Sequence, residues 1–338
     1  MLQTHPHRRD RRSPGGRTHG MTLVELMVAL AIGSFLLVGA VTVFVQSRAT
    51  FRVTESVARL QENARFVLDA LEPDIRMANY WGLTTRTNKV QGRAAPIDPV
   101  AFAVAGDCGN NWSVNLAAEI DGSNNGYDWD CAANGGAQAN ADTLIIRRVE
   151  EDPTAPVAGR LQVQSARFQD SQLFDTADVP DGYSAATSQT HALVVNGYYV
   201  SPTSALSTAD NNVPSLRVKT LVGGPRIEDR EVLPGVEDMQ VQFGVDMDPP
   251  GAPNRGSIDR YVNPGDPILD PTNAAFVPDA AILSVRVWLR LRAERPEVGF
   301  TDTTNYVYAD RDVAAPNDQF RRIVVSKTIY IRNARPAT

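Results

Sequence analysis

Cysteine and histidine are both scarce in this sequence. Among 338 residues there are two cysteines and four histidines, and only His191 lies beyond the first 20 residues. A zinc site needs more ligands than the two cysteines provide, and no histidine lies near them. No G-x-S-x-G, P-loop or H-E-x-x-H stretch occurs, so a Ser-His-Asp or Cys-His enzyme would have to use His191. Its neighbours are typical of a strand start, so we expect a structural or exposed histidine, no enzyme and no cofactor.

A net positive charge is found only in the first 20 residues. Residues 1–20 hold five arginines against Asp10 alone, although the whole chain has a net charge of −6. The remainder is therefore acidic and shows no concentrated basic patch. This composition argues against a nucleic-acid partner.

The two cysteines, Cys108 and Cys131, lie close together in an otherwise cysteine-free chain. This pattern predicts one local disulfide, which is typical of an oxidising compartment. Closing a loop of that size would contribute roughly 3 kcal/mol in the chain-entropy model. A pair of free thiols is the alternative.

One long apolar run, Met21 to Val45, contains a single charged residue, Glu25. It is long enough to cross a hydrocarbon core of about 30 Å. Because the arginines precede it, we expect a cytoplasmic N-terminus and a periplasmic body. The best small-x-small cleavage site, Val38-Gly39-Ala40, is embedded in the run, which is poor for an ordinary secretory signal. A plain signal anchor remains an alternative, but it gives no reason for Glu25.

The basic leader, glycine and T-L-V-E-L stretch resemble the class III signal of type IV prepilins. The matching residues are Gly20, Met21, Thr22, Leu23, Val24, Glu25 and Leu26. The resemblance implies that a membrane aspartyl peptidase, the prepilin peptidase, cuts after Gly20 and methylates Met21 as the new N-terminus. Members of this family often have Phe at that position, and Met is a permitted departure.

The resemblance also supplies a physical reason for Glu25. Cleavage would create a positive α-amine at the edge of the lipid, where a charge is tolerable only when it is paired. Glu25 is one helical turn along, so it could pair with its own amine or with that of a neighbouring subunit. Pairing between subunits would select one axial register during assembly. The alternative is a glutamate tolerated near the interface.

A helical stripe follows the apolar run. Its apolar positions, spaced three or four apart with charged residues between them, are Val53, Val57, Leu60, Ala64, Val67, Leu71 and Ile75. This period predicts one helix from about Met21 to Leu71. Pro73 is expected to break or kink it, with a short extra turn to Ala78.

The sequence after residue 82 favours β-structure. Candidate strands are 143–149, 161–165, 192–200, 216–222, 239–245, 282–292 and 322–331. Within 282–292, apolar residues alternate with Arg286, Trp288, Arg290 and Arg292, which predicts a half-buried antiparallel strand with a solvated arginine face. Long polar loops separate the strands, at 105–141, 166–190, 249–279 and 295–318.

We therefore expect an α+β fold of the type IV pilin kind, with a long N-terminal helix packed on an antiparallel sheet. The predicted divisions are a basic leader (1–20), a membrane and assembly helix (21–45), its amphipathic continuation (46–79) and a periplasmic β-rich domain (80–338).

Residues 121–126 resemble the first half of an EF-hand loop, with oxygen side chains at positions one, three and five and glycine at six. The twelfth position is Ala132 rather than glutamate, so the closing bidentate ligand is missing. The candidate calcium ligands are Asp121, Asn125, Asp128 and Asp130, and the alternative is a turn-rich disulfide loop. Asp246, Asp248 and Asp259 are weaker candidates for a metal ion.

Three further stretches resemble minor pilins of the PilW family. They are LPGVEDMQV with FGVD (233–246), IRMANYWG (75–82) and ADTLIIRR (141–148). The resemblance implies a low-abundance subunit that joins other minor pilins near the pilus tip and primes polymerisation of the major pilin. Such a subunit would be needed for piliation and twitching motility. A tip-associated adhesin is a further implied partner, and the inner membrane holds the protein before assembly.

Two other functions remain open on the sequence. The pseudopilin J of type II secretion systems is a near relative of these pilins, sharing the long helix and a two-sheet body. A periplasmic enzyme on a signal anchor is the third hypothesis, and the absence of a credible catalytic constellation counts against it.

Overall fold

The protein is described by a computed structural model that covers residues 20–84, 89–92, 102–118 and 120–334. The chain divides into two compact units, one that ends at Thr54 and one that begins at Glu55. The predicted leader, apart from Gly20, lies outside the described residues.

Helix α1 runs from Leu23 to Arg76 and so passes through both units. The predicted continuous helix is confirmed. Pro73 lies in its last turn, where it removes one backbone donor without ending the helix. The chain then continues as turns, with the Met77 amide donating to the Pro73 carbonyl at 3.1 Å, and Asn79 adopts a φ of 60° that ends the helical path.

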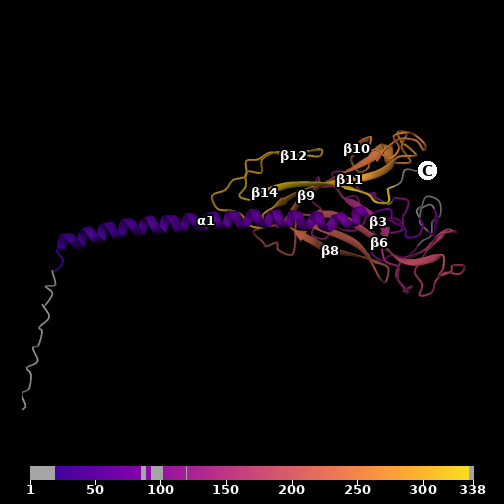
Figure 1. The fold of residues 1–338 in the computed structure, drawn as a ribbon, viewed down its shortest axis with the longest axis horizontal. Coiled ribbons are helices and arrows are strands. Elements are labelled where there is room, and N and C mark those ends of the chain that lie inside the picture. Colours follow the sequence, from indigo (N-terminus) through magenta and orange to yellow (C-terminus); the bar gives the residue numbers. More distant parts are fainter. Residues whose placement is uncertain (1–19, 85–88, 93–101, 119, 335–338) are drawn as a thin grey trace, which may run out of the picture. The chain divides into compact units, whose positions relative to one another are not determined.

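The second half of α1 packs on the β-rich unit through the predicted stripe. Val67, Leu71 and Ile75 are each 0% exposed, and Leu60 and Ala64 are nearly as buried. Burying a large aliphatic side chain contributes about 1.5–3 kcal/mol, so this stripe fixes the helix to the sheets. In Figure 1 the second half of α1 lies with β9, β11 and β14 on one side and β8 on the other.

The larger sheet has eight strands. They are β1 (Val90–Gln91), β2 (Ile120–Asp121), β3 (Leu144–Val149), β4 (Gln162–Ala166), β5 (Ser171–Phe174), β6 (Ser188–Ser201), β7 (Ser215–Val222) and β8 (Arg226–Pro234). Their order is β1-β5-β4-β6-β3-β2, with β7 joining β6 to β8. Every pairing is antiparallel except the short one between β1 and β5.

The smaller sheet has four antiparallel strands in the order β10-β9-β11-β14. They are β9 (Val236–Asp246), β10 (Arg260–Val262), β11 (Ala281–Arg292) and β14 (Arg322–Tyr330). A 3₁₀ turn, η2 (Pro267–Leu269), follows β10, and a separate ribbon pairs β12 (Tyr306–Tyr308) with β13 (Arg311–Val313).

Two cores fill the β-rich unit. One joins the α1 stripe to apolar residues of both sheets, among them Ile146, Leu216 and Val287. The other lies beside the disulfide and contains Trp81, Trp112 and Trp129. The predicted α+β architecture, a long N-terminal helix on antiparallel sheets, is therefore confirmed.

The prediction that the arginines of β11 form a solvated face was wrong for two of them. Arg290 is only 9% exposed, and the side chain of Arg292 is 13% exposed. Arg290 stands over the ring of Tyr306 and Arg292 over that of Phe320. The polar segment after β11 folds back over these arginines, and its aromatic rings face their guanidinium groups.

Candidate functional site

The predicted cleavage segment is open to solvent at the start of α1. Gly20 and Met21 are both exposed, with Met21 at 62%. A Cβ added to Gly20 would meet no heavy atom within 4 Å. The bond between these residues is therefore accessible on the described part of the chain.

Glu25 forms a capping box with Thr22. Its Oε2 accepts hydrogen bonds from the Thr22 amide and hydroxyl, both at 3.0 Å, while the Glu25 amide donates to the Thr22 hydroxyl at 3.2 Å. This reciprocal arrangement satisfies two donors at the helix start. Our sequence reasoning missed it, although the spacing T-x-x-E is the signature of such a box. Glu25 thus has a local role in the helix besides the assembly role we predict for it.

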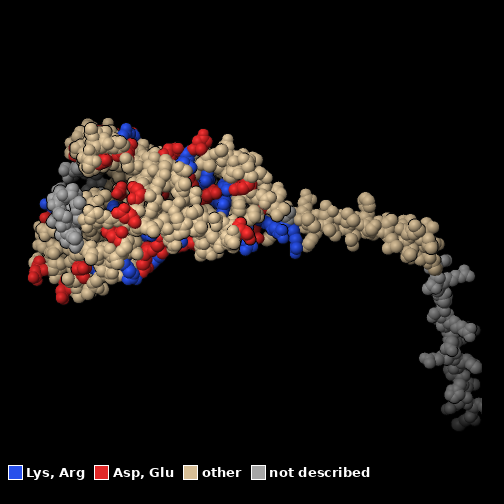
Figure 2. Space-filling model, turned by 180° about the vertical axis from the view of Figure 1, so that it is seen from behind, with Lys and Arg blue, Asp and Glu red and all other residues tan. Residues whose placement is uncertain are grey.

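The first half of α1 exposes its apolar side chains on every face. Phe35 is 85% exposed, Leu23 75% and Leu36 70%. Among the described helices, α1 alone is long and apolar enough to cross a membrane, and none of its most apolar stretch is buried. Figure 2 shows this segment almost without acidic or basic side chains. Such a surface requires lipid or other apolar helices to cover it.

The predicted disulfide between Cys108 and Cys131 is present. It ties a loop whose aromatic side chains pack on β6: Trp129 lies 5.5 Å from Trp112 and 6.0 Å from Tyr199 between ring centroids. A Cβ on Gly197 would approach the Trp129 ring to 2.7 Å, so this strand position requires glycine. The disulfide and the aromatic cluster together connect the described part of the 105–141 loop to itself and to β6.

The half EF-hand motif serves as a turn. Asp121 accepts the amide of Gly122 at 2.8 Å, and Asn125 sits at a φ of 56°. The Asn125 amide donates to Asp142 at 2.7 Å, and its side chain donates to Asp310 at 3.1 Å. Both donor groups of Asn125 bond to protein partners, whereas its Oδ1, the atom that a calcium ion would bind, has no hydrogen-bond partner among the described residues. The donor contacts build the turn, and the calcium site stays a prediction.

Asp142 holds this turn to the smaller sheet. Its second oxygen accepts the Val241 amide at 2.7 Å, and the residue is 1% exposed. Burial raises the pKa of Asp142 to about 7, against the effect of the two amide bonds. Because this pKa is raised on folding, the group's contribution to stability decreases as the pH rises from about 4 to about 7.

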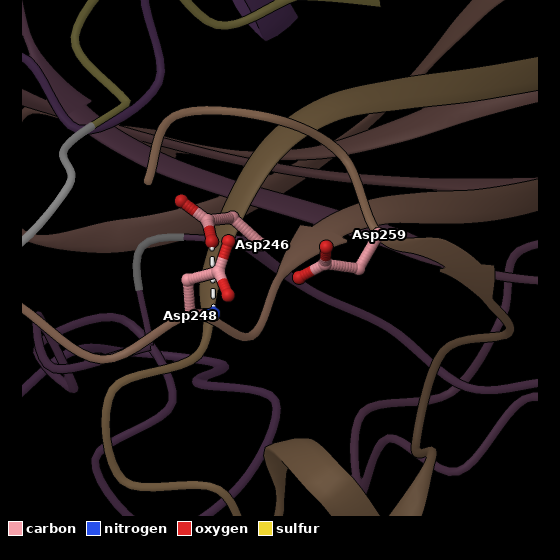
Figure 3. A group of neighbouring side chains, drawn as sticks. All are labelled: Asp246, Asp248 and Asp259. Atoms are coloured by element: carbon pink, nitrogen blue, oxygen red, sulfur yellow. Dashed lines mark hydrogen bonds between the residues drawn. The ribbon is translucent and has the colours of Figure 1, made fainter. Parts of the chain in front are cut away.

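The weaker metal candidates, Asp246, Asp248 and Asp259, are the three that the fold brings together. One carboxylate oxygen from each lies within 4.8 Å of the others (Figure 3). Asp246 accepts the amides of Asp248 at 3.0 Å and Gly256 at 2.7 Å. Asp259 accepts the Met247 amide at 2.6 Å.

A guanidinium group already compensates this acidic cluster. Arg255 Nε lies 3.6 Å from Asp246 Oδ2, and both side chains are buried. Arg255 also donates to the carbonyl oxygens of Asp248 and Asp279. The aspartates therefore organise the proline-rich loop between β9 and β11 through its amides, and Arg255 does so through its carbonyl oxygens.

His191 is a buried structural residue on β6. It is 1% exposed, and its Nδ1 lies 2.9 Å from the Glu150 carbonyl, to which the neutral ring donates. Its Nε2 is buried without a hydrogen-bond partner among the described residues. Burial lowers its pKa, because a second N–H would have no acceptor. Gly82 packs directly on the ring, since an added Cβ would lie 2.9 Å from it.

Two family models match the chain. The family described as Type IV Pilus-assembly protein W matches residues 197–333, which include the end of β6, strands β7 and β8, and the smaller sheet. The prokaryotic N-terminal methylation motif matches residues 16–41, which include the predicted cleavage segment. No curated protein matches the chain.

Among solved structures, the chain is similar to a type IV-like pilin from Thermus thermophilus. The two share 12% identity with a TM-score of 0.36, over 81% of this chain and 96% of that one.

Proposed function

We propose that this chain, which belongs to the PilW-type pilins, is a minor pilin that primes assembly of a type IV pilus near its tip. One observation carries the proposal: a methylation motif at the start of the long helix and a PilW match over the C-terminal strands lie on the same chain. The methylation motif supports processing as a pilin, and the PilW match supports a PilW-type body rather than that of another pilin.

Processing comes first in this proposal. The prepilin peptidase cuts the exposed bond between Gly20 and Met21, and Met21 becomes the methylated N-terminus. The chain then spans the inner membrane once, with its body in the periplasm, where the Cys108–Cys131 disulfide can form.

Assembly uses the apolar half of α1. Its exposed side chains leave lipid and pack on the helices of other minor pilins and of the major pilin, which replaces one apolar environment by another. Glu25 pairs with the α-amine of a neighbouring subunit. A wrong axial register would leave both charges unpaired in an apolar core, which costs several kcal/mol.

The β-rich body determines the position of the subunit. It carries long segments outside the sheets, such as the disulfide loop and the segment 302–318, whose aspartates pair with Arg322. Such a body suits a few subunits at the tip, where fewer neighbours surround it, and a tip adhesin is the partner proposed beyond it. The role is structural, which agrees with the buried, backbone-bonded state of His191.

Gene deletion tests the proposal. Loss of surface pili and twitching, restored by the wild-type gene, is the expected result. Loss of protein secretion with pili intact would instead identify a pseudopilin of a type II secretion system. Sequencing the N-terminus of the membrane-extracted protein should give methylated Met21, and an intact leader would contradict the prepilin assignment.

A further inference from the structure

Strand β14 is a long edge strand whose outer side is open. It pairs with β11 from Arg322 to Tyr330 in an uninterrupted antiparallel register. The smaller sheet ends there, because its order is β10-β9-β11-β14.

The register shows which backbone groups point outward. The Ala293 amide donates to the Arg321 carbonyl, and the Ile331 amide donates to the Leu283 carbonyl. Odd-numbered residues of β14 therefore bond to β11, since hydrogen-bonded pairs alternate along an antiparallel ladder. The amide and carbonyl groups of Val324, Ser326 and Thr328 face away from the sheet, and no described residue bonds to them.

The other edges of these sheets are protected. β10 has three residues, and β1 and β2 have two each. β8 carries five charged residues, ends in Pro234 and begins beside Ala105, whose carbonyl accepts the Ile227 amide. Short length, charge and proline are the devices that natural edge strands use against further pairing.

β14 lacks these devices. Its nine residues contain no proline, and its ladder with β11 contains no bulge. Its two cations are already paired: Arg322 with Glu237, Asp302 and Asp318, and Lys327 with Glu72 and Asp69. Neither charge is free to repel an incoming strand.

The side chains of β14 also describe what would fit. Ile323 and Val325 are only partly buried at the margin of the core that includes α1. Ser326 is exposed, and Thr328 on the same face is half-buried. A paired segment in which apolar and polar residues alternate would place its apolar residues on the face of Ile323 and Val325. Its polar residues would then lie on the face of Ser326 and Thr328.

We propose that β14 accepts an extended strand from a neighbouring minor pilin, which continues the smaller sheet across the subunit boundary. This inference rests on the proposed function. The edge lies beside the last turns of α1, where Lys327 reaches Glu72 and the Arg332 amide donates to the Arg76 carbonyl. A pilin packed along α1 therefore brings its body to this edge, and a low-abundance subunit meets other pilins more often than its own copies.

Ser326→Pro is the variant that tests this edge. Proline removes the outward amide and its ring blocks a strand on that side, whereas an outward position on an edge strand tolerates proline in the fold. Ser326→Ala keeps the amide and is the matched control. In the deletion strain we expect Ser326→Pro to restore piliation at least about tenfold less well than Ser326→Ala. The full-length protein should show the same thermal midpoint with either substitution.

Hydrogen exchange gives an independent result on the same edge. In detergent, we would compare the full-length chain alone with the complex it forms when co-expressed with the minor pilins of its own pilus. The amides of Val324, Ser326 and Thr328 should exchange on the order of tenfold or more slowly in the complex. Those of Val325 and Lys327, already bonded to β11, should change little.

Three outcomes would overturn the proposal. One is full complementation by a folded Ser326→Pro protein, and another is unchanged exchange of the three outward amides in the complex. The third is their protection in the isolated chain with rising concentration, which would assign the edge to a second copy. Full piliation of the deletion strain would instead overturn the proposed function, so the two failures are distinguishable.

Discussion

The two halves of α1 use the same backbone and present opposite surfaces. In the first half, apolar residues occur on all faces and Leu36 is 70% exposed. In the second half, Leu71 is 0% exposed, whereas charged residues such as Arg65 lie on the outer face. The difference shows that the second half is stabilised by its own chain, while the first half depends on a membrane or other subunits.

Substituting Glu25 should give the largest effect, on assembly alone. Glu25→Ala removes both the charge and the capping box, and Glu25→Gln removes the charge but keeps a capping partner for Thr22. We expect both variants to be cleaved and both to fail in piliation, counted by electron microscopy. Normal piliation with Glu25→Gln would show that capping, and not charge pairing, is the role of this residue.

Asp74 anchors the end of the second half, so its loss should affect the body instead. The carboxylate is 5% exposed and accepts from Arg148 at 2.7 Å, Asn196 at 2.9 Å and Tyr198 at 3.0 Å. Asp74→Ala leaves the Arg148 charge without this partner and should lower the free energy of unfolding by about 3–5 kcal/mol. Chemical denaturation of the detergent-solubilised protein measures this.

Asp69→Ala is the matched control for that change. Its side chain is 57% exposed, and its contacts with Arg65 at 3.7 Å and with Lys327 at 3.8 Å are both long, so we expect at most about 1 kcal/mol. Equal losses from the two variants would contradict the anchoring role of Asp74.

Truncating one leucine in each half tests the contrast most directly. Leu71→Ala should destabilise the body by about 2–5 kcal/mol, because it opens a cavity in a close-packed core. Leu36→Ala removes the same atoms from an exposed position and should leave the unfolding of the body unchanged. A comparable loss from Leu36→Ala would mean that the first half also packs within its own chain.

Removing the disulfide should cost the body less. Replacing Cys108 and Cys131 together by serine frees a loop with a sequence separation of 23. We expect a loss of roughly 3 kcal/mol in the free energy of unfolding, measured against the oxidised wild-type protein. If the aromatic cluster alone orders the loop, the loss should be much smaller.

A pH dependence from His191 is the smallest expected effect. Its pKa is lowered below the ordinary value of 6.5, so the unfolded chain binds the proton first as the pH falls. Stability from this group is therefore complete above about pH 6.5 and decreases below it. Asp142 has the opposite sign, so the informative measurement is the difference between the wild type and His191→Asn.

His191→Asn keeps a donor for the Glu150 carbonyl and has no titrating ring. The stability of the variant relative to the wild type should therefore increase as the pH falls from 7 to 5. Parallel stability curves over this range would contradict a neutral, buried His191.

The sequence predicted the regular parts of the fold well. All seven candidate strands are present, because each has enough apolar or alternating residues to identify a buried face. The strand β8 was missed because its charged residues resemble a loop, and it exists by pairing with β7 along its whole length. The short strands in the polar loops were missed for a related reason, since two to four residues carry no periodic pattern.

The candidate sites show the same difference between local contacts, which the sequence indicates, and contacts between distant segments, which it does not. The capping box at Thr22 and Glu25 was missed, although its partners are local and the spacing T-x-x-E could have predicted it. The carboxylates of Asp246, Asp248 and Asp259 come together only because β10 folds back antiparallel on β9. Arg290 and Arg292 alternate with apolar residues, which is the pattern of a solvated face. Only the structure shows that the segment after β11 covers them.

The sequence by itself determined the helix, its two different surfaces, the methylation signal and the pairing of the cysteines. These depend on local spacing and composition, and a single pair of thiols allows one partner each. Only the tertiary structure decided which edge is open at β14, what neutralises Arg322 and Lys327, and where Asp74 is bound. The physical reason is that backbone pairing and buried charge depend on segments far apart in the chain, whose meeting no local pattern records.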